Sequence, residues 1–160
     1  MSLPPFSYVD IEAATENWSE YVTSDGSKIL LRSVLVNVVR FAQYDAFGKP
    51  AYAPLSVNLM SVRAQKELRG NPTNPPPSPQ ELAMSTVEEV TIKPIRATPN
   101  NYKLSDGTDL TLTLAITSVK RTDKYDQLGE PMYIIESQNI IKLDVPKALY
   151  RKPPAAAISK

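Results

Sequence analysis

The chain has 160 residues, of which 42% are hydrophobic and 22% are charged, a composition typical of a globular protein the size of one ordinary domain. It contains neither Cys nor His, which excludes disulfides, thiolate nucleophiles, the usual general base and the commonest zinc ligands. The net charge of +1 provides no overall field that would draw the protein to nucleic acid or to a membrane surface.

The sequence predicts neither a signal peptide nor a transmembrane segment. Met-Ser-Leu-Pro-Pro has no basic flank and no apolar segment after it, so it does not resemble a signal peptide. No apolar run approaches the roughly 20 residues that a membrane-spanning helix needs. We therefore expect a cytoplasmic protein, or one held within an assembled particle, with no membrane partner.

The most informative feature is an internal repeat. Residues 21–68 and 102–149 align without a gap at an offset of 81, and 16 of the 48 paired positions are identical. The similarity extends upstream, where Val9 and Ile11 match Val90 and Ile92. Because self-similarity at a fixed period is typical of repeated structural units, the sequence predicts a tandem duplication of half the chain.

Each copy begins with extended segments, expected at 6–12 and 18–23 in the first copy and at 86–95 and 99–104 in the second. A turn follows, at Ser24–Ser27 and at Ser105–Thr108. The Asp-Gly pair in both turns indicates a β-hairpin, because Gly takes a positive φ without steric cost. A calcium loop is the alternative, but neither turn has the density of oxygen ligands that calcium needs.

The next segment of each copy predicts a long strand. Leu110, Leu112, Leu114 and Ile116 alternate with Thr and Ala, as in a strand with one buried face. The alternation slips by one residue before Val119, and the first copy slips at the corresponding place. A shared slip predicts a β-bulge that bends the strand.

A Gly- and Pro-containing loop then leads to a last strand in each copy. The loops cover residues 44–52 and 125–133, and the strands are expected at 51–62 and 132–145. Each unit would then have four strands. The sequence predicts a mainly antiparallel all-β fold in which two internally duplicated four-strand units form a pseudo-twofold β-barrel or sandwich of about eight strands. It leaves open whether the units close one barrel, stand as separate beads or exchange segments between chains.

The boundaries follow from this plan. The first repeat unit takes residues 1–69, a Pro-rich linker takes 70–85, the second unit takes 86–151, and 152–160 is a flexible tail. Within the linker, Ser78, Pro79 and Glu81 form the pattern of a capping box, which predicts a single helical turn through Leu82–Met84. We expect the two units to pack as one domain.

Four side chains recur in both copies and form the candidate binding site: Arg40, Tyr44, Asp45 and Tyr52, with Arg121, Tyr125, Asp126 and Tyr133. Arg offers a planar fork of donors, and Tyr offers an aromatic face with a hydroxyl group. The structural alternative is that Asp caps each loop, Arg pairs with it and the Tyr rings cover the end of the fold. No catalytic site and no cofactor or metal are expected.

These features favour a non-enzymatic structural or interaction protein. We expect it to assemble with itself as a homo-oligomer, or with a protein partner in a larger assembly. The alternative is a binding module for a small polar ligand or single-stranded nucleic acid that uses the duplicated Arg-Tyr-Asp-Tyr loops.

Overall fold

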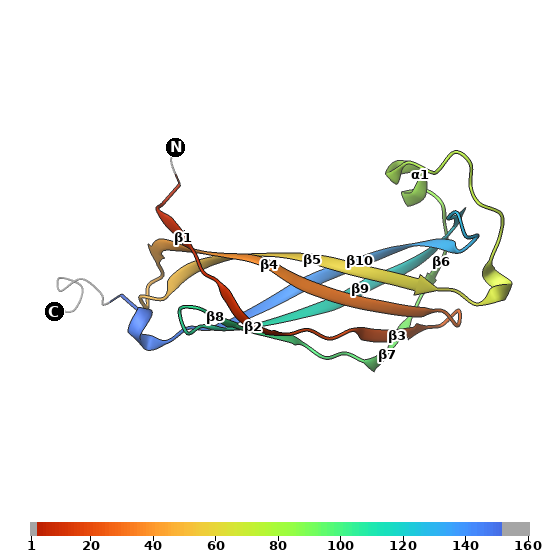
Figure 1. The fold of residues 1–160 in the computed structure, drawn as a ribbon. Coiled ribbons are helices and arrows are strands. Elements are labelled where there is room, and N and C mark those ends of the chain that lie inside the picture. The colour runs from red at the N-terminus through yellow and green to blue at the C-terminus, as the bar shows by residue number, and fades with distance from the viewer. Residues whose placement is uncertain (1–2, 152–160) are drawn as a thin grey trace.

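The computed structural model describes residues 3–151, and it has an all-β fold with antiparallel sheets. The first sheet contains β1 (Phe6–Tyr8), β3 (Ser19–Thr23), β4 (Lys28–Tyr44), β5 (Pro50–Arg63) and β7 (Ile92–Arg96). The second contains β2 (Ile11–Thr15), β6 (Thr86–Val90), β8 (Asn100–Leu104), β9 (Asp109–Tyr125) and β10 (Pro131–Asp144). The long strands β4, β5, β9 and β10 run along the molecule, and Figure 1 shows α1 (Pro79–Ala83) at one end of them.

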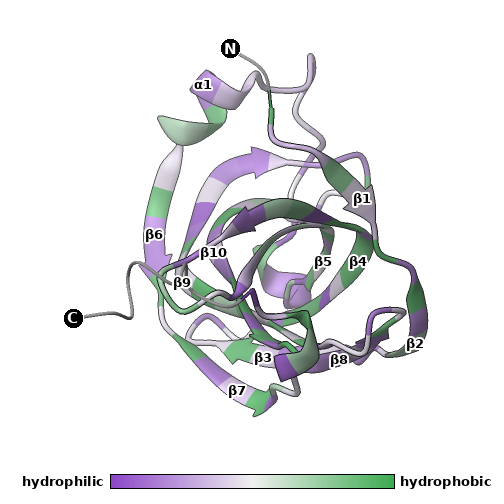
Figure 2. Cartoon of the chain, turned by 90° about the vertical axis from the view of Figure 1, so that its left-hand side faces the viewer, coloured by the Kyte–Doolittle hydropathy of each residue, from purple (hydrophilic) through white to green (hydrophobic). Residues whose placement is uncertain are grey.

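The prediction of a β-barrel or sandwich of about eight strands needs correction in its number of strands and in its barrel alternative. The described residues form ten strands, because each of the segments predicted at 6–12 and 86–95 is two short strands in different sheets. The chain changes sheets between them, at the buried residues Val9 and Val90. The strands of the two sheets surround a common interior (Figure 2), but no ladder of hydrogen bonds joins β5 to β10 in the described chain, so the sheets do not close into a barrel.

The two halves of the chain exchange strands. β2 comes from the first half and pairs with β8 of the second, whereas β7 comes from the second half and pairs with β3 of the first. The bounds of β2, β3, β4 and β5 recur 81 residues later in β7, β8, β9 and β10. The turns η1 (Lys66–Leu68) and η2 (Lys147–Leu149) have the same spacing. Each sheet therefore contains a strand from the other half of the sequence.

The turns and bulges agree with the sequence analysis. Gly26 and Gly107 have φ angles of 84° and 91°, so the Asp-Gly turns use the positive φ that Gly permits. The ladder between β4 and β5 shifts register between Leu35 and Asn37, and the ladder between β9 and β10 shifts at the corresponding position. Both predicted bulges are confirmed, and each bends a 17-residue strand.

The core consists of two apolar clusters, and each takes side chains from both halves. The first joins Leu35 and Val38 of β4 to Tyr102, Leu110 and Leu112 of the second half. The second joins Ile29 and Leu31 of the first half, with Tyr21, to Val90 and Val119 of the second. In each cluster the hairpin around one Asp-Gly turn packs on the bulged strand of the other half, so neither half contains a complete core cluster of its own.

The linker contains the predicted helical turn. Ser78 and Glu81 form the reciprocal capping box, and the helix covers Pro79–Ala83. No helix in the described residues is long and apolar enough to cross a membrane. The predicted tail, 152–160, lies outside the described residues.

Candidate functional site

The Asp of each Asp-Gly turn accepts hydrogen bonds from an Arg and a Tyr of the other half. Arg121 Nη1 lies 3.0 Å from Asp25 Oδ2, and the hydroxyl of Tyr133 donates to the same oxygen at 2.7 Å. Arg121 also pairs with Glu88 of β6 at 2.8 Å. The Tyr133 hydroxyl lies 2.8 Å from the Ser27 hydroxyl. We call Asp25, Arg121 and Tyr133 the first interlock.

The second interlock has the same geometry with the halves reversed. Arg40 Nη1 lies 2.8 Å from Asp106 Oδ2, and the Tyr52 hydroxyl donates to that oxygen at 2.6 Å. The Tyr52 hydroxyl also lies 3.0 Å from Thr108 Oγ1. Each residue of this second interlock, formed by Asp106, Arg40 and Tyr52, is 81 positions from the residue of the same type in the first. Four of the eight predicted site residues therefore bind the opposite half of their own chain.

Local structure positions each member of an interlock. Asp25 lies at the start of its turn, where its other oxygen accepts hydrogen bonds from the Ser27 amide and the Thr23 hydroxyl. Arg121 and Tyr133 are directly opposite each other in the β9–β10 ladder, so their side chains emerge on the same face of the sheet. Arg40 and Tyr52 are opposite each other in the same way in the β4–β5 ladder.

The carboxylates of the interlocks are almost buried and remain ionised. The side chains of Asp25 and Asp106 are 5% and 9% exposed. Burial acts to raise the pKa of Asp25, but hydrogen bonds from Thr23, Tyr133, Ser27 and Arg121 outweigh it and hold the pKa below its ordinary value. The pKa of Asp106 is lowered in the same way, chiefly by Tyr52 and Thr108 against the effect of burial. A carboxylate that holds its charge this firmly is a weak general base at neutral pH.

The other four predicted site residues lie in the hairpin loops or at the strand ends beside them, and they belong to neither interlock. Asp45 Oδ1 accepts the amides of Phe47 and Lys49, and Asp126 Oδ1 accepts those of Leu128 and Glu130, so both Asp residues cap their own loops. Tyr44 stacks beneath the guanidinium of Arg151 at 5.5 Å. Tyr125 lies against the linker, where its amide donates to Thr73 Oγ1 at 2.9 Å. The structural alternative was right about the caps, whereas the Arg residues pair with different carboxylates.

Each loop is also held by the segment that follows the last strand of the other half. The Gly70 amide donates to the Gly129 carbonyl at 2.9 Å, and the Arg151 amide donates to the Gly48 carbonyl at 2.8 Å. A Cβ atom on Gly48 would lie 1.9 Å from the Arg151 carbonyl oxygen, and one on Gly129 would lie 2.4 Å from that of Gly70. Gly is required at both loop positions because the other half's backbone passes too closely for a side chain.

One open groove contains two of the predicted site residues. It has a volume of about 260 Å³ and is lined by Phe6, Arg40, Phe41 and Tyr44, among others. The rings of Phe6 and Phe41 meet edge to face, with centroids 6.1 Å apart. At the corresponding positions the second half has Val87 and Thr122 in place of Phe6 and Phe41, so the pair of Phe rings belongs to the first half alone.

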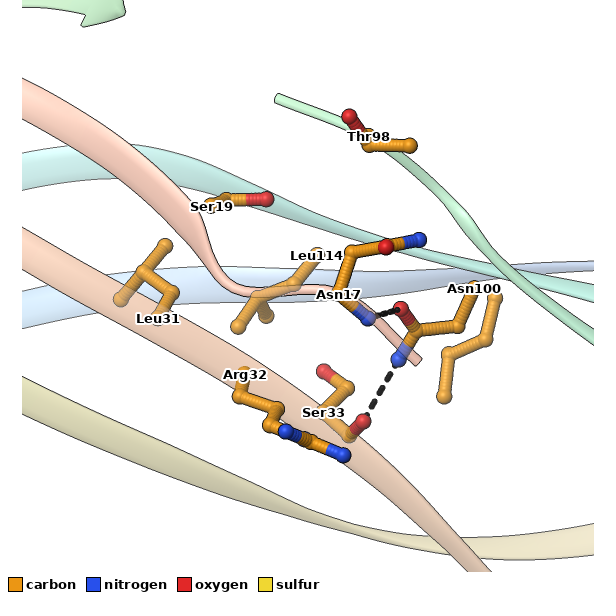
Figure 3. A pocket seen from close by; sticks show the side chains of 9 residues that line it. Asn17, Ser19, Leu31, Arg32, Ser33, Thr98, Asn100 and Leu114 are labelled. Carbon is orange, nitrogen blue, oxygen red and sulfur yellow. Dashed lines mark hydrogen bonds between the residues drawn. The ribbon is translucent and has the colours of Figure 1, made fainter. Parts of the chain in front are cut away.

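A polar pocket between the halves is too small for an organic ligand (Figure 3). Asn100 is 3% exposed, accepts the Asn17 amide at 2.8 Å and donates to the Ser33 carbonyl at 2.6 Å. The adjacent Tyr102 hydroxyl donates to Glu16 at 2.8 Å. The cavity measures about 10 Å³, which accommodates one water molecule. This pocket is therefore a polar contact between the halves.

The described residues contain no group of three or more acidic side chains placed to hold a metal ion. All buried side-chain nitrogen and oxygen atoms in residues 3–151 have hydrogen-bond partners. The arrangement therefore presents saturated polar clusters that join the halves, plus one aromatic groove at the surface.

Comparison with known proteins gives no family model that matches the sequence, no curated protein that matches it and no solved structure that matches it.

Sequence reasoning missed Asp25 and Asp106 as site residues, because an Asp that precedes Gly in a tight turn is already explained by the turn. The available signal was that Asp, Arg and Tyr are all identical between the copies. That identity does not reveal which Asp meets which Arg, because the two partners are separated by 96 residues in one interlock and by 66 in the other.

The interlocks predict an alkaline loss of stability. Burial, with the hydrogen bond to Asp25, raises the pKa of Tyr133 from 10.0 to about 12, so the folded state favours the neutral phenol. This stabilisation is fully present below pH 10.0 and is lost as the pH rises through about 12. We expect Tyr133→Phe to lower the free energy of unfolding by about 1–2 kcal/mol at pH 7.

The difference between wild type and Tyr133→Phe should shrink as the pH approaches 12, as followed by urea unfolding at a series of pH values. The control is Tyr8→Phe, whose ring is exposed and whose replacement should leave stability unchanged. A difference that stays constant up to this pH would contradict the interlock.

Proposed function

We propose that this chain is a non-enzymatic structural or interaction protein that assembles through the exposed apolar residues of β4 and β5 in its first sheet. One observation carries the proposal: Val36 of β4 and Leu55, Val57 and Leu59 of β5 are all 45% or more exposed. Leu55, Val57 and Leu59 alternate along the strand and so lie on one face. A contiguous apolar patch on a sheet is typical of an interaction surface.

The corresponding face of the second sheet is more polar, which supports a specific role for the first, although Ile140, the counterpart of Leu59, is also exposed. At an offset of 81, Leu55 and Val57 are replaced by Glu136 and Gln138, and Val36 is replaced by Thr117. If exposed apolar residues on this face came only from the requirements of the fold, both sheets would carry them. One sheet is thus suited to contact with protein and the other to contact with water.

We also propose that the chain arose by duplication of a unit of half its length, with pseudo-twofold symmetry between the units. The equal spacing of the strand bounds, the two bulges and the two interlocks support this. So does the contact between Asn58 and Asn139, which occupy equivalent positions and donate to each other's side-chain oxygens at 3.0 and 3.3 Å. A residue that contacts its own equivalent is expected near a twofold axis.

The chemistry of the interlocks supports a role without catalysis. Their carboxylates are already paired with Arg and Tyr, so a substrate would have to displace contacts that join the halves. Asp45 and Asp126 are committed to loop amides in the same way.

Self-assembly predicts a mass that depends on concentration. We expect light scattering behind a sizing column to give values above the chain mass of 17.7 kDa at high protein concentration. Leu55→Glu, which copies the residue of the second sheet, should return the mass to that of the monomer, because it places a charge in the apolar face. A mass of 17.7 kDa at every concentration would contradict self-assembly.

The aromatic groove favours a second candidate function, the binding of a small polar ligand or single-stranded nucleic acid. Phe41 and Tyr44 offer faces on which bases could stack, and Arg40 offers a donor for phosphate. The groove would then use one copy of the Arg-Tyr-Asp-Tyr loop, since Phe6 and Phe41 have no aromatic counterpart in the second half.

A matched pair of substitutions tests this alternative. Arg40→Ala and Arg121→Ala each remove the Arg of one interlock, but only Arg40 lines the groove. If the groove binds nucleic acid, fluorescence anisotropy with a labelled oligothymidylate should show binding that Arg40→Ala weakens and Arg121→Ala leaves intact. No binding by the wild type at low salt would exclude this function.

A further inference from the structure

We propose that the partner in self-assembly is a second copy of this chain, and that its β5 pairs antiparallel with the free edge of β5 in a register centred on Val57. The inference rests on the proposed function and names its partner. It would place two copies of the first sheet side by side as one continuous sheet with a twofold axis through the centre of the pairing.

The free edge of β5 is long and open. Within the described residues β5 pairs only with β4, along 14 residues, so every second backbone amide and carbonyl on its other side lacks a strand partner. Residues 57–61 are exposed without interruption, although their side chains alternate between the two faces of the sheet. The inner face of this segment contacts β10, where Asn139 hydrogen-bonds to Ser56 and Asn58, so an added strand would have to enter in the plane of the first sheet, alongside β5.

The edge also lacks the charges that usually prevent strand addition. No Asp, Glu, Lys or Arg lies between Ala51 and Val62. The equivalent strand β10 carries Glu136, Lys142 and Asp144, all of them exposed. Charged side chains on an edge strand oppose pairing with another chain. β10 has this protection and β5 does not, so pairing is expected at β5 alone.

The other exposed edges are less suited to pairing. β7 is only five residues long and carries Lys93 and Arg96, whereas β5 has 14 residues, although Pro54 of β5 also lacks an amide hydrogen. β2 is only five residues long and includes Glu12. Among these edges, β5 combines length, openness and absence of charge.

The sequence of β5 is complementary to itself. When Val57 lies opposite Val57 of the second copy, Leu55 lies opposite Leu59 and Ala53 lies opposite Ser61. Facing residues of an antiparallel pair point to the same side, so the apolar patches of both copies join into one surface across the new ladder. If the register between the two copies shifted by one residue, the exposed Leu and Val residues of one copy would face the inward-pointing residues of the other. This mismatch disfavours the shifted register.

The size of this contact indicates a reversible dimer. A 14-residue strand is about 45 Å long and a sheet is about 10 Å thick, so the edge presents roughly 450 Å². A standard stable interface takes about 800 Å² from each partner. We therefore expect dissociation on dilution, with the backbone hydrogen bonds of the ladder providing specificity.

A charge at the centre of the register tests the site. Val57→Lys would place two ammonium groups opposite each other in the dimer, whereas Gln138→Lys makes the equivalent change on β10. We expect light scattering to show a dimer of 35.4 kDa (2 × 17.7 kDa) for the wild type and for Gln138→Lys at high concentration. Val57→Lys should give the monomer under the same conditions, with an unchanged far-ultraviolet circular dichroism spectrum.

Engineered cysteines test the register independently, and they remain informative if Val57→Lys does not fold. The chain has no Cys, so each introduced thiol is unique. Facing Cα atoms of an antiparallel pair are about 4.5–5.5 Å apart, a separation that a disulfide can bridge. Val57→Cys should form a disulfide-linked dimer on mild oxidation, and Leu55→Cys mixed with Leu59→Cys should form one together. Leu55→Cys alone should not, since it lies about 13 Å from its own copy.

The outcomes separate this inference from the proposed function. Oligomers that persist in Val57→Lys, or that crosslink through Gln138→Cys and not through Val57→Cys, would overturn the β5 pairing while self-assembly stands. A wild type that remains at 17.7 kDa at all concentrations would overturn both. Loss of the dimer in Val57→Lys together with crosslinking at residue 57 would establish both.

Discussion

The fold depends on the burial of each Asp-Gly turn carboxylate against an Arg and a Tyr from the opposite half of the chain. A buried carboxylate is costly to leave unpaired, so Asp25 and Asp106 can only be tolerated when the two halves are correctly placed. The same placement completes both apolar clusters and allows β2 and β7 to pair across the halves. The hydrogen bonds of the buried carboxylates, the packing of the core and the pairing of the strands all require the same placement of the two halves. Agreement between these levels is what gives a sequence a unique fold.

Much of the local structure could be predicted from the sequence, because it depends on neighbouring residues. The Asp-Gly turns, the bulges before Val38 and Val119 and the capping box at Ser78 follow from short-range patterns, and all are present in the structure. The failures concern distant partners. The change of sheet at Val9 was missed because an interrupted strand and a continuous one have similar alternation over seven residues. The interlocks were missed because no local pattern pairs Arg121 with an Asp that lies 96 residues away.

The differences between the halves support the proposed function. The residues of the two interlocks are the same in both copies, as with Tyr52 and Tyr133, and they are used by internal contacts. Among the residues that differ, some lie on the surface: the apolar positions Leu55 and Val57 and the aromatic groove at Phe41 occur only in the first half. Under the proposed function, the contacts common to both halves would hold the body together, and the uncharged edge strand β5 would provide its interaction surface.

The measurement that tests the central claim most directly is the unfolding of Asp106→Asn in urea. Trp18, the only Trp, lies in the first half, so its fluorescence reports on that half while circular dichroism reports on all strands. Asp106 belongs to the second half, yet the interlock predicts that both unfolding transitions move together to lower urea concentration. The free energy of unfolding should fall by about 1.5–3 kcal/mol. Asp109→Asn, at an exposed carboxylate, should change stability by less than about 0.5 kcal/mol. The account would be contradicted if the urea midpoint of the Trp18 fluorescence transition did not change while the circular dichroism transition moved to lower urea concentration.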